Sequence, residues 1–111
     1  KEQLVMTGVL CFTGVIEDIG KVIFKGTARE NHLVITLKIN PRQILSRLEP
    51  GEDIAVNGVC LTIKEVDSNG FTVQLWPVTQ EKTTLINLDC GDLVNLERRA
   101  DREETENEPL C

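Results

Sequence analysis

Two pairs of residues alternate along predicted strands and could together hold a flat polar ligand. Cys60 and Thr62 are two positions apart, and so are Gln74 and Trp76. Because successive side chains of a strand point to opposite faces, the members of each pair share a face. A hydroxyl, an amide and extended backbone can match the donors and acceptors along the edge of a pterin-like ring. Each net hydrogen bond would contribute roughly 0.5–1.5 kcal/mol.

The same four residues also allow a structural interpretation. Cys60 and Thr62 on one face of a strand are compatible with an ordinary barrel wall that binds nothing. Trp76 is equally compatible with a core position, where its indole packs instead of serving as a stacking platform. The strand pattern leaves both interpretations open.

The residue inventory argues against several other chemistries. The sequence contains no G-x-G-x-x-G or G-x-x-x-x-G-K-[ST] loop to hold a phosphate. Its one histidine, His32, lies in a predicted polar loop, where we expect an ordinary surface residue. The absence of tyrosine excludes an R-x-Y-S flavin signature. Cys60 remains the candidate nucleophile, but a reactive thiolate needs a lowered pKa, and no cation adjoins Cys60 in the sequence.

Composition indicates one soluble domain that avoids polyanions. The chain has 111 residues and a formal net charge of −6, so we expect it to repel nucleic-acid backbones and anionic membranes. No apolar run is long enough to span a bilayer. The four cysteines, with no C-x-x-C pair, predict neither a zinc site nor a disulfide framework. We therefore expect a reducing compartment, the cytoplasm. The cysteines are Cys11, Cys60, Cys90 and Cys111.

Short strands separated by turn residues dominate the hydropathy pattern. Asn57-Gly58 suits a two-residue hairpin turn, and Pro77 ends the strand before it. Such strands with little helix predict a closed antiparallel barrel, whose interior is filled by side chains, so a ligand must bind at its mouth or flank. The predicted strands are 12–18, 21–26, 33–39, 53–56, 59–66, 71–76 and 93–97.

Two short helical pieces are predicted between these strands. Asn40-Pro41 is typical of a helix start, with asparagine as the cap and an apolar stripe that ends at Leu48. Thr79 to Leu85 is long enough for one or two helical turns. Before them, Leu33, Ile35, Leu37 and Ile39 alternate as the core face of one strand.

Three sequence blocks, in order, resemble one half of a riboflavin synthase, a family that includes the lumazine proteins. Phe12-Thr13-Gly14-Val15-Ile16-Glu17 resembles the opening M-F-T-G-I-[IV]-x. Residues 51–62, which end in Cys60-Leu61-Thr62, resemble G-x-S-[IV]-A-x-x-G-x-C-L-T. Residues 91–98, which begin with Gly91-Asp92, resemble the closing G-D-x-V-N-[IVL]-E-R.

The resemblance implies an all-β fold, a six-stranded antiparallel Greek-key barrel with one or two short helices. It implies a barrel domain over residues 12–100, with an extension at 1–11 and a charged tail at 101–111. The implied ligand is 6,7-dimethyl-8-ribityllumazine or riboflavin, with no further cofactor required, and a homodimer is the expected assembly. The implied contacts are Gly14, Val15, Ile16, Cys60, Leu61, Thr62, Gln74, Leu75, Trp76, Pro77, Val78 and Thr79.

Two departures from the family pattern leave three functions open. Pro77-Val78-Thr79-Gln80 stands where the family has K-E-T-L, and nothing matches the second barrel of a riboflavin synthase or its S-G-H motif. We expect a lumazine- or flavin-binding module. The first alternative is a riboflavin synthase that converts two lumazines to riboflavin through a homodimer or a missing second barrel. The second is a structural barrel whose ligand site was lost at Pro77-Val78.

Overall fold

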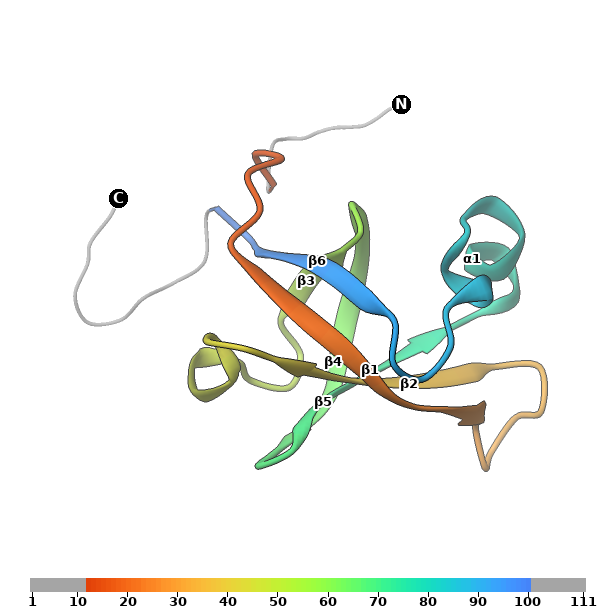
Figure 1. The fold of residues 1–111 in the computed structure, drawn as a ribbon. Helices are drawn as coiled ribbons and strands as arrows, with labels where there is room; N and C mark the ends of the chain where they lie inside the picture. The colour runs from red at the N-terminus through yellow and green to blue at the C-terminus, as the bar shows by residue number, and fades with distance from the viewer. Residues whose placement is uncertain (1–11, 101–111) are drawn as a thin grey trace.

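The computed structural model describes residues 12–100, and the predicted extension at 1–11 and tail at 101–111 lie outside the described residues. The described residues form a six-stranded barrel with one short helix and two 3-10 turns (Figure 1). The strands are β1 (Asp18–Thr27), β2 (Ile35–Pro41), β3 (Asp53–Val56), β4 (Val59–Asp67), β5 (Gly70–Leu75) and β6 (Leu93–Arg98). The helical pieces are η1 (Leu45–Arg47), α1 (Pro77–Lys82) and η2 (Leu85–Asn87).

All neighbouring strands are antiparallel, and the sheet closes on itself. The order around the barrel is β1-β2-β5-β4-β3-β6, so β2 pairs with β5 and β3 pairs with β6 across long stretches of sequence. Closure comes from β1 and β6, in a register that runs from Asp18 opposite Leu96 to Lys21 opposite Leu93. The predicted six-stranded Greek-key barrel with short helices is therefore confirmed.

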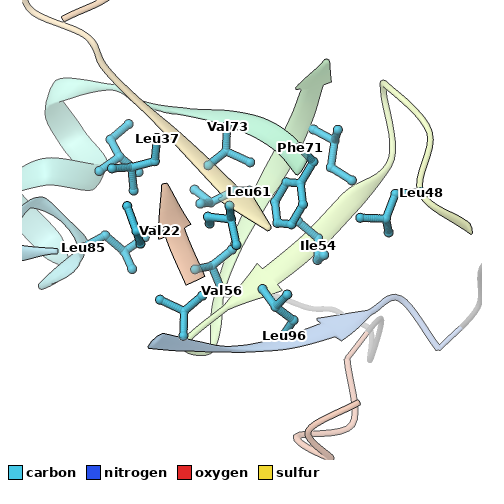
Figure 2. Close-up of a cluster of buried hydrophobic side chains, with 14 of the residues drawn as sticks. Val22, Leu37, Leu48, Ile54, Val56, Leu61, Phe71, Val73, Leu85 and Leu96 are labelled. Atoms are coloured by element: carbon cyan, nitrogen blue, oxygen red, sulfur yellow. The ribbon is translucent and has the colours of Figure 1, made fainter. Parts of the chain in front are cut away.

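Apolar side chains from every strand fill the barrel interior (Figure 2). Phe71 is the largest fully buried side chain, and it lies among aliphatic residues of the other strands. A filled interior leaves no room for a ligand inside, so a binding site has to lie on the outer surface. The labelled core residues are Val22, Leu37, Leu48, Ile54, Val56, Leu61, Phe71, Val73, Leu85 and Leu96.

The prediction of two strands at 12–18 and 21–26 is wrong. Residues 12–17 form no strand, and β1 runs without a break from Asp18 to Thr27. Gly20, between the two predicted strands, lies inside β1 and is buried. A Cβ there would meet Ile39 Cγ2 at 2.6 Å and Leu96 Cδ1 at 2.9 Å. The glycine allows three strands to approach closely, a requirement that its neighbours in sequence do not reveal.

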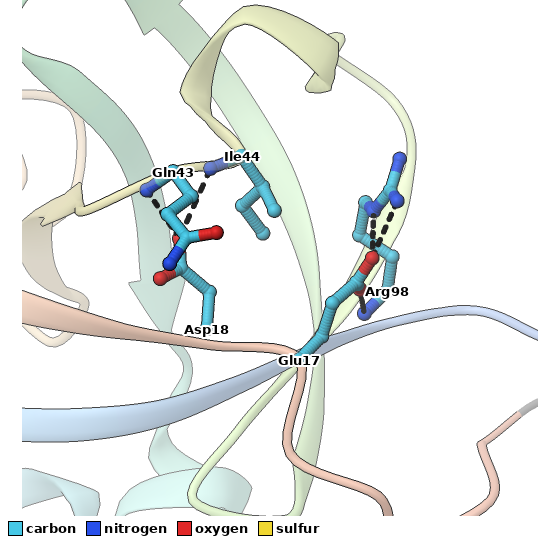
Figure 3. A network of polar contacts seen from close by, with 5 residues as sticks. All are labelled: Glu17, Asp18, Gln43, Ile44 and Arg98. Atoms are coloured by element: carbon cyan, nitrogen blue, oxygen red, sulfur yellow. Dashed lines mark hydrogen bonds and ion pairs between the residues drawn. The ribbon is translucent and has the colours of Figure 1, made fainter.

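The predicted helix that begins at Asn40-Pro41 is also wrong. Both residues still belong to β2, where they pair with β1, and η1 is a single turn that starts at Leu45. No side chain caps η1, and the buried carboxylate of Asp18 on β1 instead accepts hydrogen bonds from the backbone N–H groups of the two residues before η1, Gln43 (2.8 Å) and Ile44 (3.0 Å; Figure 3). Asn40 uses its side chain elsewhere and donates to the Asn69 carbonyl.

Two further boundaries differ from the sequence prediction. Leu33 is 68% exposed and precedes β2, which begins at Ile35, so it does not belong to the core face. The second helix starts at Pro77 instead of Thr79 and ends at Lys82, and Leu85 opens a separate 3-10 turn. Proline suits the first helical position because it lacks the N–H that a helix start leaves unpaired.

None of the helices among residues 12–100 has the length and apolar character that crossing a membrane would require.

The Asp18 contacts give a stability prediction. Asp18→Ala leaves two backbone N–H groups beside η1 without an acceptor. We expect a loss of about 1–3 kcal/mol in the free energy of unfolding, measured by urea denaturation. Asp18→Asn, which keeps an acceptor oxygen, should lose less. Asp92→Ala removes an exposed bond to the Asp89 N–H and should change stability by about 0.5 kcal/mol at most. Equal losses for Asp18→Ala and Asp92→Ala would contradict the assignment.

Candidate functional site

A pocket of about 390 Å³ lies where β4, the end of β5 and α1 meet. Its lining combines one thiol, two hydroxyls, one amide, one indole and one ammonium group. The ammonium group is the one charged group in this lining. The lining residues are Cys60, Leu61, Thr62, Lys64, Gln74, Trp76 and Thr79. Six of these seven belong to the ligand contacts expected from the sequence.

The turn before β4 sets which of its residues face the pocket. Asn57 and Gly58 have φ values of 50° and 85°, as the predicted hairpin turn requires, and they place Val56 opposite Val59. From there Cys60 and Thr62 are exposed while Leu61 is buried in the core. Cys60 and Thr62 therefore share the outer face.

The Thr62 hydroxyl has a fixed donor direction. It donates a 2.9 Å hydrogen bond to the carboxylate of Asp53 on β3, and the other oxygen of that carboxylate lies 3.3 Å from the Arg99 guanidinium. Because its proton is committed to Asp53, the Thr62 oxygen presents its lone pairs to the pocket. It is therefore suited to accept a hydrogen bond from an N–H or O–H of a ligand.

Trp76 is not a core residue, so that alternative is wrong. Its side chain is 52% exposed at the pocket wall, on the outer side of the end of β5 where Gln74 also lies. Leu75, between them, is fully buried. Pro77 and Val78 are exposed on α1, and neither belongs to the pocket lining.

The opening residues Gly14, Val15 and Ile16 do not line this pocket. The segment is held by the buried Glu97 carboxylate, which accepts bonds from the Thr13 N–H (2.6 Å), the Thr13 hydroxyl (2.8 Å) and the Gly14 N–H (3.0 Å). Val15 and Ile16 are exposed. Ile16 borders a separate cavity of about 220 Å³ that Glu17, Asp18, Ile19, Arg42 and Gln43 also line.

Lys64 is a lining residue that the sequence prediction missed. It continues the alternation of Cys60 and Thr62 along β4, and that spacing was the signal that could have found it. Its ammonium lies 3.3 Å from the carboxylate of Glu30, in the connection between β1 and β2. A hydrogen bond with its own backbone lowers the pKa of Glu30 most, and Lys64 lowers it further.

The site shows no arrangement typical of metal or triad chemistry. Within residues 12–100, no three His, Cys, Asp or Glu side chains gather to hold a metal ion. His32 is exposed and is not among the pocket-lining residues, so it gives Cys60 no base there. Cys60 and Cys90 are exposed thiols. The lining is suited to holding a planar, uncharged, hydrogen-bonding molecule against Trp76.

The family model for the lumazine binding domain matches residues 13–99. The chain belongs to the lumazine-binding domain family. It is 40% identical over 87 residues to the riboflavin synthase of Bacillus subtilis, a match that covers 78% of this chain and 39% of that protein. It is 39% identical over 92 residues to the riboflavin synthase of Schizosaccharomyces pombe, covering 83% of this chain and 40% of that one.

A solved structure shares the fold of this lumazine-binding domain. LumP, crystallised in complex with 6,7-dimethyl-8-(1'-D-ribityl) lumazine, superposes with a TM-score of 0.70 at 24% identity, over 90% of this chain and 52% of that one. The chain thus spans about two-fifths of the length of the riboflavin synthases it matches and about half of LumP.

The ion pair beside the pocket gives a titration prediction. We expect NMR titration to place the pKa of Glu30 below its ordinary value of 4.5. Lys64→Met should raise this pKa part of the way, because the larger cause, the backbone hydrogen bond, remains. The pair's contribution to stability is present above pH 4.5 and is lost as the pH falls through the lowered pKa. A native pKa at or above the ordinary value would contradict the pairing.

Proposed function

We propose that this barrel binds 6,7-dimethyl-8-ribityllumazine or riboflavin in the pocket between β4, β5 and α1. The observation that carries the proposal is the lining itself, where an exposed indole lines the same pocket as the Thr62 hydroxyl and the Gln74 amide of two adjacent strands. Membership of the lumazine-binding domain family and the ligand named for LumP support the choice of ring.

Each part of the pocket has a role in this proposal. The ring stacks on Trp76, an interaction that adds about 0.5–1.5 kcal/mol to the burial of apolar area. Thr62 accepts a hydrogen bond from the ligand, and Gln74 offers both a donor and an acceptor. Leu61 contributes backbone groups, since its side chain is buried in the core. Leu75 can touch the ligand only through its backbone, at the edge of the lining, because its side chain is buried and its carbonyl accepts from the Gln80 amide. Cys60 and Thr79 border the ring from opposite elements.

The remaining expected contacts belong to the rim of the proposed site. Pro77 and Val78 are exposed on α1 next to Trp76, where they can touch the part of a ligand that extends beyond the pocket. Gly14, Val15 and Ile16 are exposed in the opening segment and outside the lining. In this proposal the opening segment contacts ligand held by a second copy of the barrel, as part of a homodimer in the cytoplasm.

Riboflavin synthase activity is the second candidate, favoured by the identity to riboflavin synthases. That reaction needs two lumazines stacked face to face, and their proximity can supply up to about 7–11 kcal/mol of the barrier. One barrel with one pocket holds one lumazine, so activity requires a homodimer or a second barrel. Cys60 is then the candidate nucleophile. We propose ligand binding as the primary function because it requires no partner.

Titration with 6,7-dimethyl-8-ribityllumazine tests the proposal. We expect saturable quenching of Trp76 emission while the visible absorbance stays that of lumazine over hours. Growth of the riboflavin band would instead support the synthase. If neither lumazine nor riboflavin binds saturably at high micromolar concentration, the proposal fails, and a structural barrel without a ligand is the function that remains.

A substitution tests the role of Thr62. Thr62→Ala should weaken lumazine binding about 2- to 12-fold, which corresponds to one net hydrogen bond of roughly 0.5–1.5 kcal/mol. Thr62→Ser, which keeps the hydroxyl, should bind within about twofold of the native protein. Thr72→Ala is the matched control, because Thr72 lies on β5 outside the pocket lining. An affinity for Thr62→Ala equal to that of Thr72→Ala would contradict the contact.

A further inference from the structure

Helix α1 forms one wall of the pocket although none of its own residues is buried in the core. None of its six residues, Pro77–Lys82, is buried, and no side chain caps its start at Trp76. A helix this short is unstable in isolation, and the usual source of stability, an apolar face packed on a core, is missing here. Figure 1 shows it outside the barrel, beyond the end of β5. Something other than core packing has to fix the wall that carries Thr79.

The side chain of Gln80 supplies that attachment. Its Nε2 donates to the backbone carbonyl of Leu75 at the end of β5, at 2.7 Å, and to the backbone carbonyl of Leu33 before β2, at 2.8 Å. Both partners are acceptors, so both hydrogens of the amide are used and its orientation is fixed. One side chain therefore joins α1 to the strand it follows and to a loop 47 positions away in sequence.

The two residues that Gln80 controls are both in the pocket lining. Thr79 directly precedes it, and Trp76 accepts the first backbone hydrogen bond of the helix from the Gln80 N–H at 3.0 Å. If the Gln80 amide is removed, α1 loses its side-chain bonds to Leu33 and Leu75 and can move relative to the barrel. Thr79 then moves relative to Gln74 and Thr62, which sit on the rigid barrel.

We propose that Gln80 is a positioning residue for ligand binding: it does not line the pocket, but it holds α1 so that Thr79 and Trp76 face the β4 wall. This inference rests on the proposed binding of lumazine or riboflavin in that pocket. The residue acts through geometry, so its removal weakens ligand binding far more than it weakens the fold.

Gln80→Met tests the proposal, because methionine keeps the length of the side chain and loses both donors. We expect lumazine and riboflavin to bind about tenfold more weakly, which is the loss of about 1.4 kcal/mol of interaction. The thermal midpoint should fall by less than about 6 °C, because the bond to the Leu33 carbonyl is exposed and water can replace the amide there. The emission of Trp76 in the ligand-free protein should shift. Glu81→Met, an exposed neighbour on the same helix, is the matched control and should bind as the native protein does.

A double-mutant cycle separates positioning from general damage. Thr79→Ala should weaken binding in the native background and have a much smaller effect in the Gln80→Met background. In the latter, Thr79 is already displaced and contributes little to ligand binding. If Gln80→Met also lowers the thermal midpoint strongly, Gln80→Lys distinguishes positioning from loss of stability, because a lysine ammonium can donate to the carbonyls of both Leu33 and Leu75. Restored affinity then supports the proposal, and unrestored affinity overturns it.

The outcomes for the two proposals are distinct. Equal affinity and equal Trp76 emission for Gln80→Met and the native protein would overturn the role of Gln80 while the binding function stands. Additive effects of Thr79→Ala and Gln80→Met would overturn it too. If the native protein binds neither ligand, the proposed function fails, and the role of Gln80 in ligand binding falls with it.

Discussion

Closure of the barrel by β1 and β6 is the constraint on which the rest of the structure depends. Around the ring β1 is separated from β4 by β2 and β5 on one side and by β6 and β3 on the other, so closure lies opposite the pocket wall. Polar groups reinforce it: the Glu17 carboxylate accepts bonds from the Arg98 backbone and guanidinium (Figure 3). The Glu97 carboxylate holds the opening segment. An open sheet would flatten and would lose the curvature that brings β4 and β5 together under α1.

A closed barrel of this size has a filled core, and that decides where chemistry can occur. Phe71, Leu37 and Ile63 occupy the interior, so the polar residues of β4 and β5 are forced outward by strand alternation. The outer faces of two strands alone make a shallow surface. The pocket gains its depth from α1, which is why a helix that adds nothing to the core still matters for the site.

Local patterns in the sequence predicted the parts of the fold that depend on neighbours in sequence. The Asn57-Gly58 turn and the alternation along β4 and β5 are of this kind, and they were enough to put Cys60 on one face with Thr62 and Gln74 on one face with Trp76. That these are outer faces follows only from the structure, where Trp76 is exposed. The errors arose where the partner is distant. Gly20 is needed because Ile39 and Leu96 approach it, and the backbone before η1 is held by Asp18 of β1 and not by Asn40. Gln80 could not be found for the same reason, since its partners are backbone carbonyls of Leu33 and Leu75.

The positions of Pro77 and Val78, which depart from the family pattern, argue against loss of the candidate site. Proline restricts the residue before it to extended backbone, and Trp76 has φ −78° and ψ 161°. Pro77 therefore both starts α1 and fixes the backbone of the residue whose indole lines the pocket. Val78 is 57% exposed and does not line the pocket, so the side chain that differs from the family's glutamate lies outside the lining. Thr79, which matches the family pattern, remains in it. Pro77 and Val78 thus both lie outside the pocket lining.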